Sequence, residues 1–427
     1  MTEPFRAVKG WLSSSAHRNE GSAGRAAMSE RARYRATFVE HAALAIALRT
    51  LRPAPVRAGA DGRLRVTFLS PLPSSHLGTE VRFTRWVPYL RALGCDVEVL
   101  GAATDAEFAD FTSGNPNADT RYYHACIYSQ WRNIKRAATA DVIVLHRGLF
   151  PFSPWQRPTF ERLLARLNPR LVYDFYDPIW LQRRAASRRS SRAARWLHPA
   201  DKIEEVIRLA KVVTVSNEPL ARFARRHHPD VRIIPILLEP GEYEPQRHKQ
   251  RSPVVLGWLG SAGNLPLLFS IAPALRRLAA RRDIVVRVVS SESVEIPGVP
   301  VESHTHPWTP QSEVEDLARL DIGLLPLEDD PKDINRSPYK LMQYLAAGLP
   351  VVATPVAIDL TRLKSGEAFL AASSEDEWVA SLERLVDDVD LRARLGNSGR
   401  DAVVAHFSFE RHAPAFLDTL LTASGRK

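Results

Sequence analysis

Residues 337–340 combine a hydroxyl group, a proline and a lysine in an order that suits phosphate binding. Ser337 precedes Pro338, and Lys340 follows two residues later. Serine is common at the N-cap of a helix, and proline fits the first helical turn, where its missing N–H is not needed. The N–H groups at a helix start attract an anion, and Lys340 adds a positive charge there. The pattern predicts a seat for a diphosphate.

The alternative for this stretch is an ordinary strand–loop–helix–strand unit with a surface lysine. Residues 321–327 form an apolar run typical of a buried parallel strand. The predicted helix ends at Gly348 and Pro350, and residues 351–353 begin the next strand. Both interpretations predict the same elements, so the choice between them depends on the rest of the chain.

A second group of polar residues follows the strands predicted in the first half of the chain. These strands cover residues 65–70, 141–145 and 171–173, and the residues after them are Ser74, His76, His146, Asp174 and Asp177. Ligands of α/β sheets bind at the carboxyl ends of the strands. The first loop lacks G-x-G-x-x-G, so a dinucleotide is not indicated. The alternatives are a backbone-bonded histidine and aspartates that cap the following helix.

Strands and helices alternate in two blocks, which predicts two doubly wound, Rossmann-like parallel sheets. The expected organisation is an N-terminal extension, a first domain, a polar linker, a second domain and a C-terminal helix that crosses back to the first domain. Their limits are residues 1–62, 63–238, 239–253, 254–405 and 406–427. Two such domains predict a cleft between them, which is the usual place for a substrate.

The composition is that of a soluble globular protein, with 45% apolar and 25% charged residues among 427. No stretch approaches about 18 uninterrupted apolar residues, so no transmembrane helix is expected. The N-terminus lacks an apolar signal core, which argues against secretion. Cys95 and Cys126 are the two cysteines, too few for a disulfide framework or a zinc cluster. A reducing cytoplasm fits.

The net charge of +10 suits an anionic partner, such as a nucleic acid, an anionic lipid or a phosphorylated substrate. No nucleic-acid-binding motif is present. Residues 181–196 contain six arginines and no acid, which indicates either a solvated loop or a contact with an anionic surface. A helix expected at 29–51 is predicted to dock on the body, pair with another chain or lie on a membrane. The resulting hypothesis is a cytoplasmic protein, peripheral at the inner face of the plasma membrane.

Three sequence features together resemble the GT-B glycosyltransferases of the family 4 type. They are the small-residue turn GWLGS at 257–261 at the head of the second domain, the segment DIGLLPL at 321–327, and YKLMQYLAAGLPVVATPV at 339–356. The resemblance implies a nucleotide-sugar donor held mainly by the second domain and an acceptor held by the first. It also implies hexosyl transfer with retention, in glycan, polysaccharide or glycolipid synthesis, without a metal or any cofactor beyond the nucleotide-sugar co-substrate.

The same resemblance assigns roles residue by residue. The residues expected to take part in catalysis, through the transferred sugar or the leaving diphosphate, are His146, Lys340 and Arg336. Those expected to bind the donor are Gly257, Trp258, Gly260, Ser261, Asn335, Ser337, Tyr339 and Gln343. Those expected to bind the acceptor are Ser74, His76, Asp174 and Asp177. The acceptor itself is expected to be a glycan, a lipid-linked sugar or a small molecule.

The sequence departs from this family in its charged residues. Asn335 and Gln343 occupy positions where many members carry glutamates, and an amide supplies no negative charge to bind hydroxyl groups. The loop after the first strand of the second domain lacks the usual arginine and lysine, so Arg336 and Lys340 are expected to replace them. The alternatives to a transferase are therefore a weak or inactive nucleotide-sugar binding protein and another GT-B enzyme, such as an epimerase or phosphorylase.

Overall fold

A computed structural model describes residues 62–113, 118–150, 158–181, 202–306, 309–359 and 362–426. Contacts divide the chain into two units, one ending at Ile234 and resuming at Ala415, the other covering Pro235–Pro414. Each unit is described by itself. The helix expected at 29–51 and the arginines between 183 and 195 lie outside the described residues.

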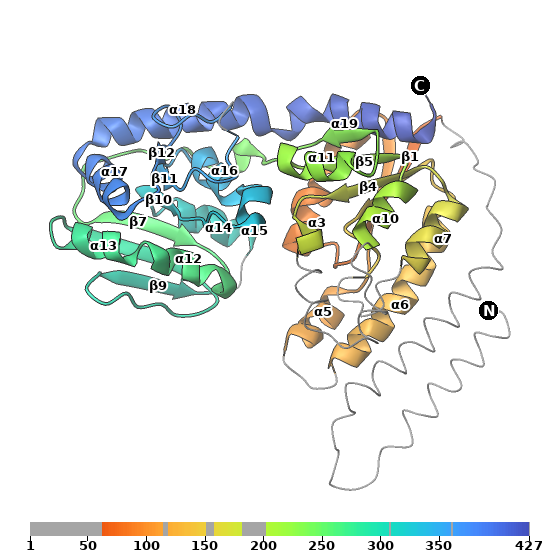
Figure 1. Cartoon of the computed structure of the whole chain (residues 1–427), viewed down its shortest axis with the longest axis horizontal. Coiled ribbons are helices and arrows are strands. Elements are labelled where there is room, and N and C mark those ends of the chain that lie inside the picture. Colours follow the sequence, from red (N-terminus) through yellow and green to blue (C-terminus); the bar gives the residue numbers. More distant parts are fainter. Residues whose placement is uncertain are drawn as a thin grey trace, which may run out of the picture. The chain divides into compact units, whose positions relative to one another are not determined.

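The first unit is a parallel sheet of six strands in the order β2-β1-β3-β4-β5-β6 (Figure 1). The order reverses between β1 and β3, as expected for a doubly wound sheet. The strands are β1 (Leu64–Ser70), β2 (Cys95–Gly101), β3 (Val142–His146), β4 (Leu171–Phe175), β5 (Val212–Val215) and β6 (Val231–Ile233). The helices are α3 (Leu77–Arg82), α4 (Val87–Ala92), α5 (Asp105–Thr112), α6 (Ala118–Ala137), α7 (Thr159–Leu167), α10 (Lys202–Leu209) and α11 (Glu218–Arg225).

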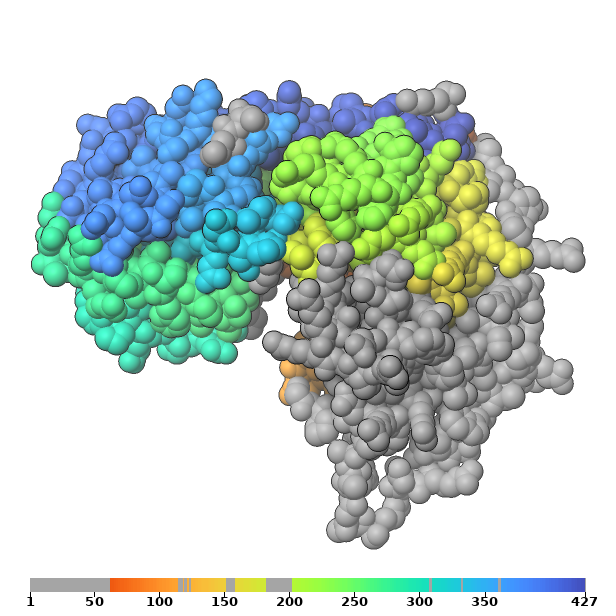
Figure 2. Space-filling model, viewed as in Figure 1, coloured from red at the N-terminus to blue at the C-terminus, as the bar shows by residue number. Residues whose placement is uncertain are grey.

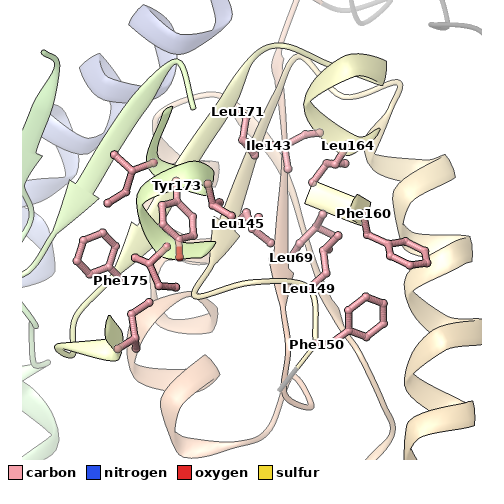
Figure 3. Close-up of a cluster of buried hydrophobic side chains, with 14 of the residues drawn as sticks. Leu69, Ile143, Leu145, Leu149, Phe150, Phe160, Leu164, Leu171, Tyr173 and Phe175 are labelled. Atoms are coloured by element: carbon pink, nitrogen blue, oxygen red, sulfur yellow. The ribbon is translucent and has the colours of Figure 1, made fainter. Parts of the chain in front are cut away.

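Both faces of this sheet are buried, which explains why its strands are almost wholly apolar. Alternate residues of β3 and β4 enter one large hydrophobic cluster, including Ile143, Leu145 and Tyr173. Figure 3 shows Phe160 and Leu164 of α7 among the side chains of this cluster. The residues between them in sequence, such as Val144 and His146, therefore point to the opposite face, because side chains alternate along a strand.

The second unit is also a parallel six-stranded sheet, in the order β12-β11-β10-β7-β8-β9. Its order reverses between β7 and β10. The strands are β7 (Val254–Leu259), β8 (Ile284–Ser290), β9 (Val301–Thr305), β10 (Ile322–Leu325), β11 (Val351–Ala353) and β12 (Leu370–Ala371). The helices are α12 (Leu265–Ser270), α13 (Ala272–Ala279), α14 (Pro310–Leu317), α15 (Pro331–Asn335), α16 (Tyr339–Ala346), α17 (Glu375–Asp387) and α18 (Val389–Phe407).

The last helix, α19 (Phe409–Ser424), supplies residues to the first unit from Ala415 onward. Phe416 packs against Trp86 with ring centroids 4.5 Å apart, and Asp418 accepts a hydrogen bond of 2.8 Å from Arg232. The C-terminal end of the chain is thus part of the first unit's core and surface. Two parallel doubly wound sheets confirm the predicted fold class.

Candidate functional site

Lys340 lies in the first turn of α16, in the second unit. Its ammonium nitrogen is 5.9 Å from the ring centroid of Trp258, a buried residue of β7. Burial lowers the pKa of Lys340 to about 8; Arg336 adds to this shift and Glu313 opposes it. The side chain is half-buried and keeps most of its positive charge at neutral pH. A weakly hydrated cation at the beginning of a helix suits binding of an anionic group.

The start of α16 differs from the sequence prediction. The N-cap is Pro338, with φ −78° and ψ 71°, and no side chain caps the helix. Ser337 lies one residue earlier, where its carbonyl oxygen accepts a 2.9 Å hydrogen bond from the Tyr339 N–H. The predicted N-cap role of Ser337 is wrong because Arg336 is extended, with ψ 161°, and Pro338 has a non-helical ψ.

Arg336 is held by a short helix that was predicted as loop. Asp330 caps this helix, α15, and Asp333 within it lies 2.9 Å from the Arg336 guanidinium. Asp333 is buried and also accepts the Glu328 N–H at 3.1 Å. The charge of Arg336 is therefore partly neutralised by its own neighbour, which makes Lys340 the better placed cation for a diphosphate.

The side chains at positions 335, 339 and 343 differ in their surroundings. Asn335 donates a 2.6 Å hydrogen bond from its side chain to the carbonyl oxygen of Pro331, inside α15. Gln343 is 7% exposed and points into the unit from α16. Tyr339 is half-buried at the helix start. The part of the chain that carries α15 is coloured cyan in Figure 2. Ile334 of this helix is 38% exposed.

The glycines after β7 serve packing at close range. A Cβ atom on Gly257 would overlap the side chain of Leu320, and one on Gly260 would overlap the Trp258 ring. The N–H of Gly260 donates to the Val289 carbonyl at 2.9 Å, which fixes the turn. Ser261 is exposed and accepts a 3.1 Å hydrogen bond from Asn264. Of these predicted donor residues, Ser261 is thus the one with an accessible polar side chain.

The first unit carries a row of buried polar side chains across three neighbouring strands. In the sheet register His146 of β3 lies beside Asp174 of β4, and Asp174 lies beside Thr214 of β5. Asp174 Oδ2 is 3.0 Å from His146 Nδ1, and the Thr214 hydroxyl donates to Asp174 Oδ1 at 2.7 Å. Arg82 of α3 donates to both carboxylate oxygens, the shortest contact being 2.6 Å. The row faces away from the large hydrophobic cluster.

Asp174 is 2% exposed, and its oxygens are fully used by Arg82, His146 and Thr214. This geometry does not fit its predicted role as a group that binds the acceptor directly. Burial would raise the pKa of Asp174, but the charge of Arg82 and the hydrogen bonds lower it strongly, so the carboxylate is ionised at neutral pH. Asp174 therefore lies in the interior, beneath the candidate site, and holds His146 through a hydrogen bond.

His146 is 1% exposed and lies between two aromatic rings. Tyr176 stacks on the imidazole with centroids 5.1 Å apart, and Phe83 meets it edge-on at 5.3 Å. Burial lowers the pKa of His146, although Asp174 opposes the shift, so the ring is neutral at pH 7. An ionised carboxylate only accepts hydrogen bonds, so Nδ1 carries the proton. Nε2 is then a bare acceptor, and it has no hydrogen-bond partner among the described residues.

The chain bends sharply after His146. Arg147 has a φ of +59°, and the Gly148 N–H donates to the His146 carbonyl at 2.6 Å. A left-handed conformation in a residue other than glycine is strained, and such strain often occurs at functional sites. The Arg147 guanidinium lies 5.8 Å from the Tyr176 ring and 3.5 Å from Asp177. Asp177 is half-buried and accessible, as expected of an acceptor-binding residue.

The remaining predicted residues lie on the loop after β1. His76 caps α3, because its Nδ1 accepts the Gly78 N–H at 3.0 Å, and burial and Arg147 lower its pKa. Ser74 is exposed, and its carbonyl accepts a hydrogen bond from Thr84 at 3.1 Å. The start of α3 lies close to the residue that follows β4, since a Cβ on Gly78 would lie 2.9 Å from the Tyr176 hydroxyl. A Cβ on Gly78 would also lie 3.4 Å from His76 Nδ1, so the His76 ring and the Tyr176 hydroxyl both lie close to Gly78.

Sequence reasoning missed Arg82, Thr214 and Tyr176. Arg82 is a charged residue in a region of helical periodicity, and such residues usually face water. Thr214 sits inside an apolar strand, where its hydroxyl carries no signal of its own. Tyr176 follows Asp174 by two residues, and that spacing at a strand end was the one available hint.

No described helix has the length and apolar character needed to cross a membrane. Within the same residues, no group of three or more His, Cys, Asp or Glu side chains is arranged to hold a metal ion.

One part of the second unit, continuing into α19, resembles a known protein family. Residues 272–418, which include α16 and Lys340, match the family model described as "Glycosyl transferase-like". Solved structures of GT-B glycosyltransferases resemble 86% of the chain. The chain has the GT-B fold. The predicted resemblance to GT-B glycosyltransferases is confirmed, whereas membership of family 4 remains a prediction. No protein with a curated description matches the sequence.

Three similar structures illustrate how far the likeness extends. Sucrose-phosphate synthase from Thermosynechococcus elongatus has a TM-score of 0.61 at 13% identity, over 86% of this chain and 100% of that one. A glycosyltransferase from Rickettsia africae has a TM-score of 0.56 at 12% identity, over 86% and 99%. HepE of Anabaena, in complex with UDP-glucose, has a TM-score of 0.55 at 12% identity, over 84% and 100%. At such identities the likeness concerns the fold.

Proposed function

We propose that this protein transfers a sugar from a nucleotide-sugar to a hydroxyl group of an acceptor. The observation that carries the proposal is the half-buried Lys340 at the start of α16, 5.9 Å from the Trp258 ring. This lysine lies in the segment that matches the glycosyl transferase-like family, and its helix follows β10, which adjoins β7 where the strand order reverses. Such switch points are where α/β sheets bind ligands.

In the proposed reaction, the bond between the anomeric carbon and the terminal phosphate oxygen breaks, and its electron pair stays on the diphosphate. The acceptor oxygen forms the new bond to the anomeric carbon, and the acceptor's hydroxyl proton passes to a diphosphate oxygen. Lys340 stabilises the negative charge that develops on the leaving group. Because the diphosphate takes the proton, the chain need not supply a strong base, which accords with retention of configuration.

On the acceptor side, accessible polar groups follow the strands of the first unit. Ser74, His76 and Asp177 lie on the loops after β1 and β4, and they are the proposed contacts for acceptor hydroxyl groups. His146 is proposed to contact the transferred sugar, because its Nε2 is an unpartnered acceptor among the described residues. The proposed acceptors remain glycans, lipid-linked sugars or small metabolites, with an anionic membrane surface as a further partner.

Uracil is the first base to test. An α-glucosyltransferase of similar fold is described in complex with UDP and DNA, and HepE in complex with UDP-glucose. A thermal-shift panel of UDP, GDP and ADP and of their glucose, mannose and N-acetylglucosamine derivatives, with and without EDTA, tests base, sugar and metal dependence together. We expect one nucleotide to raise the melting temperature in the presence of EDTA. No shift with any of them would contradict the proposal.

A second candidate function is nucleotide-sugar binding without transfer. Two observations favour it: the Asn335 amide bonds within its own helix, and the Arg336 charge pairs with Asp333. Incubation of the protein with the stabilising nucleotide-sugar, followed by measurement of released nucleoside diphosphate, separates the two. Slow release of diphosphate from the wild type that disappears in a Lys340→Met variant supports transfer chemistry. Binding with no release at all supports a binding protein.

A further inference from the structure

The buried ion pair between Arg82 and Asp174 is an unusual feature of the first unit. The two side chains are each 3% exposed, and the shortest of their contacts is 2.6 Å. Arg82 also donates to the Ile234 carbonyl at 2.7 Å. Burying two charges costs desolvation energy, so such a pair is weak evidence for stability and invites a functional explanation.

The pair is arranged around one atom of His146. Arg82 and Thr214 both donate hydrogen bonds to Asp174 Oδ1. Asp174 Oδ2 accepts a hydrogen bond from Arg82 and lies within hydrogen-bond distance of His146 Nδ1. With a guanidinium in place, the carboxylate remains an acceptor. His146 can then satisfy this contact only by donating the Nδ1 proton.

The opposite nitrogen of the same ring is left unsatisfied. His146 Nε2 is buried and has no hydrogen-bond partner within the described part of the chain. A buried acceptor without a partner is costly, and each such group in a native protein calls for an explanation. A group whose role was only packing would be served as well by an apolar side chain. The arrangement secures one nitrogen and leaves the other, a buried acceptor, without a partner among the described residues.

We propose that Arg82 and Asp174 are positioning residues that hold His146 in the Nδ1–H tautomer, so that Nε2 accepts a hydrogen bond from a hydroxyl group of the substrate sugar. The hydroxyl contact rests on the proposed function, whereas the tautomer does not. His146 serves in this scheme as a neutral acceptor and not as a proton donor. Arg82 acts through Asp174, and neither residue touches the substrate.

The test is a long-range proton–nitrogen NMR spectrum of the histidine side chains at pH 7, recorded on the full chain without substrate. A His146→Gln variant identifies the signals of this ring by their absence. We expect a protonated Nδ1 and an unprotonated Nε2 in the wild type. A wild-type spectrum with the proton on Nε2, or with both tautomers populated, would overturn the proposal without any need for a further variant.

Variants separate the charge from the packing. In Asp174→Asn the amide can donate to Nδ1, and we expect the proton to move to Nε2. Thr214→Val is the matched control, because it removes one hydrogen bond to the same carboxylate but leaves its charge; the tautomer should not change. Loss of an orienting partner typically costs about 10- to 100-fold in activity. We expect a fall of this size in kcat for Asp174→Asn, with partial recovery in Asp174→Glu.

The outcomes distinguish this proposal from the proposed function. Addition of the stabilising nucleotide-sugar should shift the Nε2 signal of the wild type, and a lack of shift with proven binding would exclude the hydroxyl contact. The expected tautomer in a protein that binds no nucleotide-sugar would leave the positioning role standing and remove the proposed function. If a folded Asp174→Asn variant transferred sugar at the wild-type rate with the wild-type tautomer, the proposed function would stand and the positioning role would be excluded.

Discussion

Lys340 of α16 lies close to Trp258 of β7 in the second unit, with the ammonium nitrogen 5.9 Å from the ring centroid. The ring lies on a central strand and is buried, so it cannot neutralise the charge but can hold the lysine chain in place. The helix start thus presents a positioned cation.

Replacing Lys340 with methionine should weaken binding of the nucleoside diphosphate. A hydrogen bond to a charged group contributes about 1.5–3 kcal/mol, which corresponds to roughly 10- to 150-fold in Kd. Titration calorimetry with UDP, or with the nucleotide that the panel selects, measures the change. Lys364→Met is the control, because this lysine is 61% exposed and lies 3.7 Å from Glu367. An equal loss in both variants would point to general charge and not to Lys340.

Nucleotide affinity should fall as the pH rises through about 8. Burial lowers the pKa of Lys340 to about 8, so the ammonium form that attracts the diphosphate is lost above that pH. A terminal phosphate ionises near pH 6, about two units lower, so its own charge is nearly constant in this range. Bound anion raises the lysine pKa, so the decline should begin near pH 8, the pKa in the free protein, and level off above the higher pKa of the complex. Calorimetry at pH 7, 8 and 9 measures it, and the Lys340→Met variant should show a flat profile.

Lys202→Met should destabilise the first unit strongly. Lys202 Nζ lies 2.8 Å from Glu161 Oε1, with both side chains at most 2% exposed. Removing one partner of such a pair leaves a buried charge and costs about 3–5 kcal/mol. The double variant Glu161→Gln/Lys202→Met should recover most of the loss, since neither charge remains. Denaturant midpoints report both effects. The exposed pair Arg281–Glu383, at 3.3 Å, is the comparison, and Arg281→Met should cost about 0–1 kcal/mol.

Gly257→Ala should lower stability, because the added Cβ would overlap the Leu320 side chain inside the second unit. Overpacking of this kind typically costs about 1–3 kcal/mol. Gly263→Ala provides a matched control, since a Cβ there would meet nothing within 4 Å. Thermal unfolding of the three proteins is the measurement. Similar melting temperatures for both variants would show that Leu320 moves aside easily.

Much of the fold was predictable because the strands are short apolar runs separated by helical periods. The runs at β3, β5, β7 and β10 are buried on both faces, so each stands out from its polar surroundings. The helices were less predictable in detail. The stretch after β7 is an example, because it forms two separate helices, α12 and α13, which meet at Ile271, two residues before Pro273. Proline begins a new helix more easily than it continues one.

The candidate site was predictable only where chemistry and sequence position coincide. His146 and Lys340 follow strands or open a helix, so their types and places give a signal. Asp174 gave the same signal but lies under the site, because burial and its partner Arg82 are set by tertiary packing. Ser337 was predicted as a cap from local preference, and α15 overrode that preference by ending one residue before Arg336. Local sequence patterns do not specify which side chains of a loop are buried, and they do not specify which charged residues pair with each other.

The row formed by His146, Asp174 and Thr214, together with Arg82, has a consequence for how the sequence can vary. These positions lie far apart in the chain but share one set of hydrogen bonds. A chain that lost the acid at 174 would leave a buried guanidinium at 82 and an undirected ring at 146. Substitutions at these positions should therefore be inherited together. In an alignment of related chains, an apolar residue at 174 should accompany the loss of arginine at 82. Such paired changes would identify a group of related proteins in which the residue at position 146 has a different role.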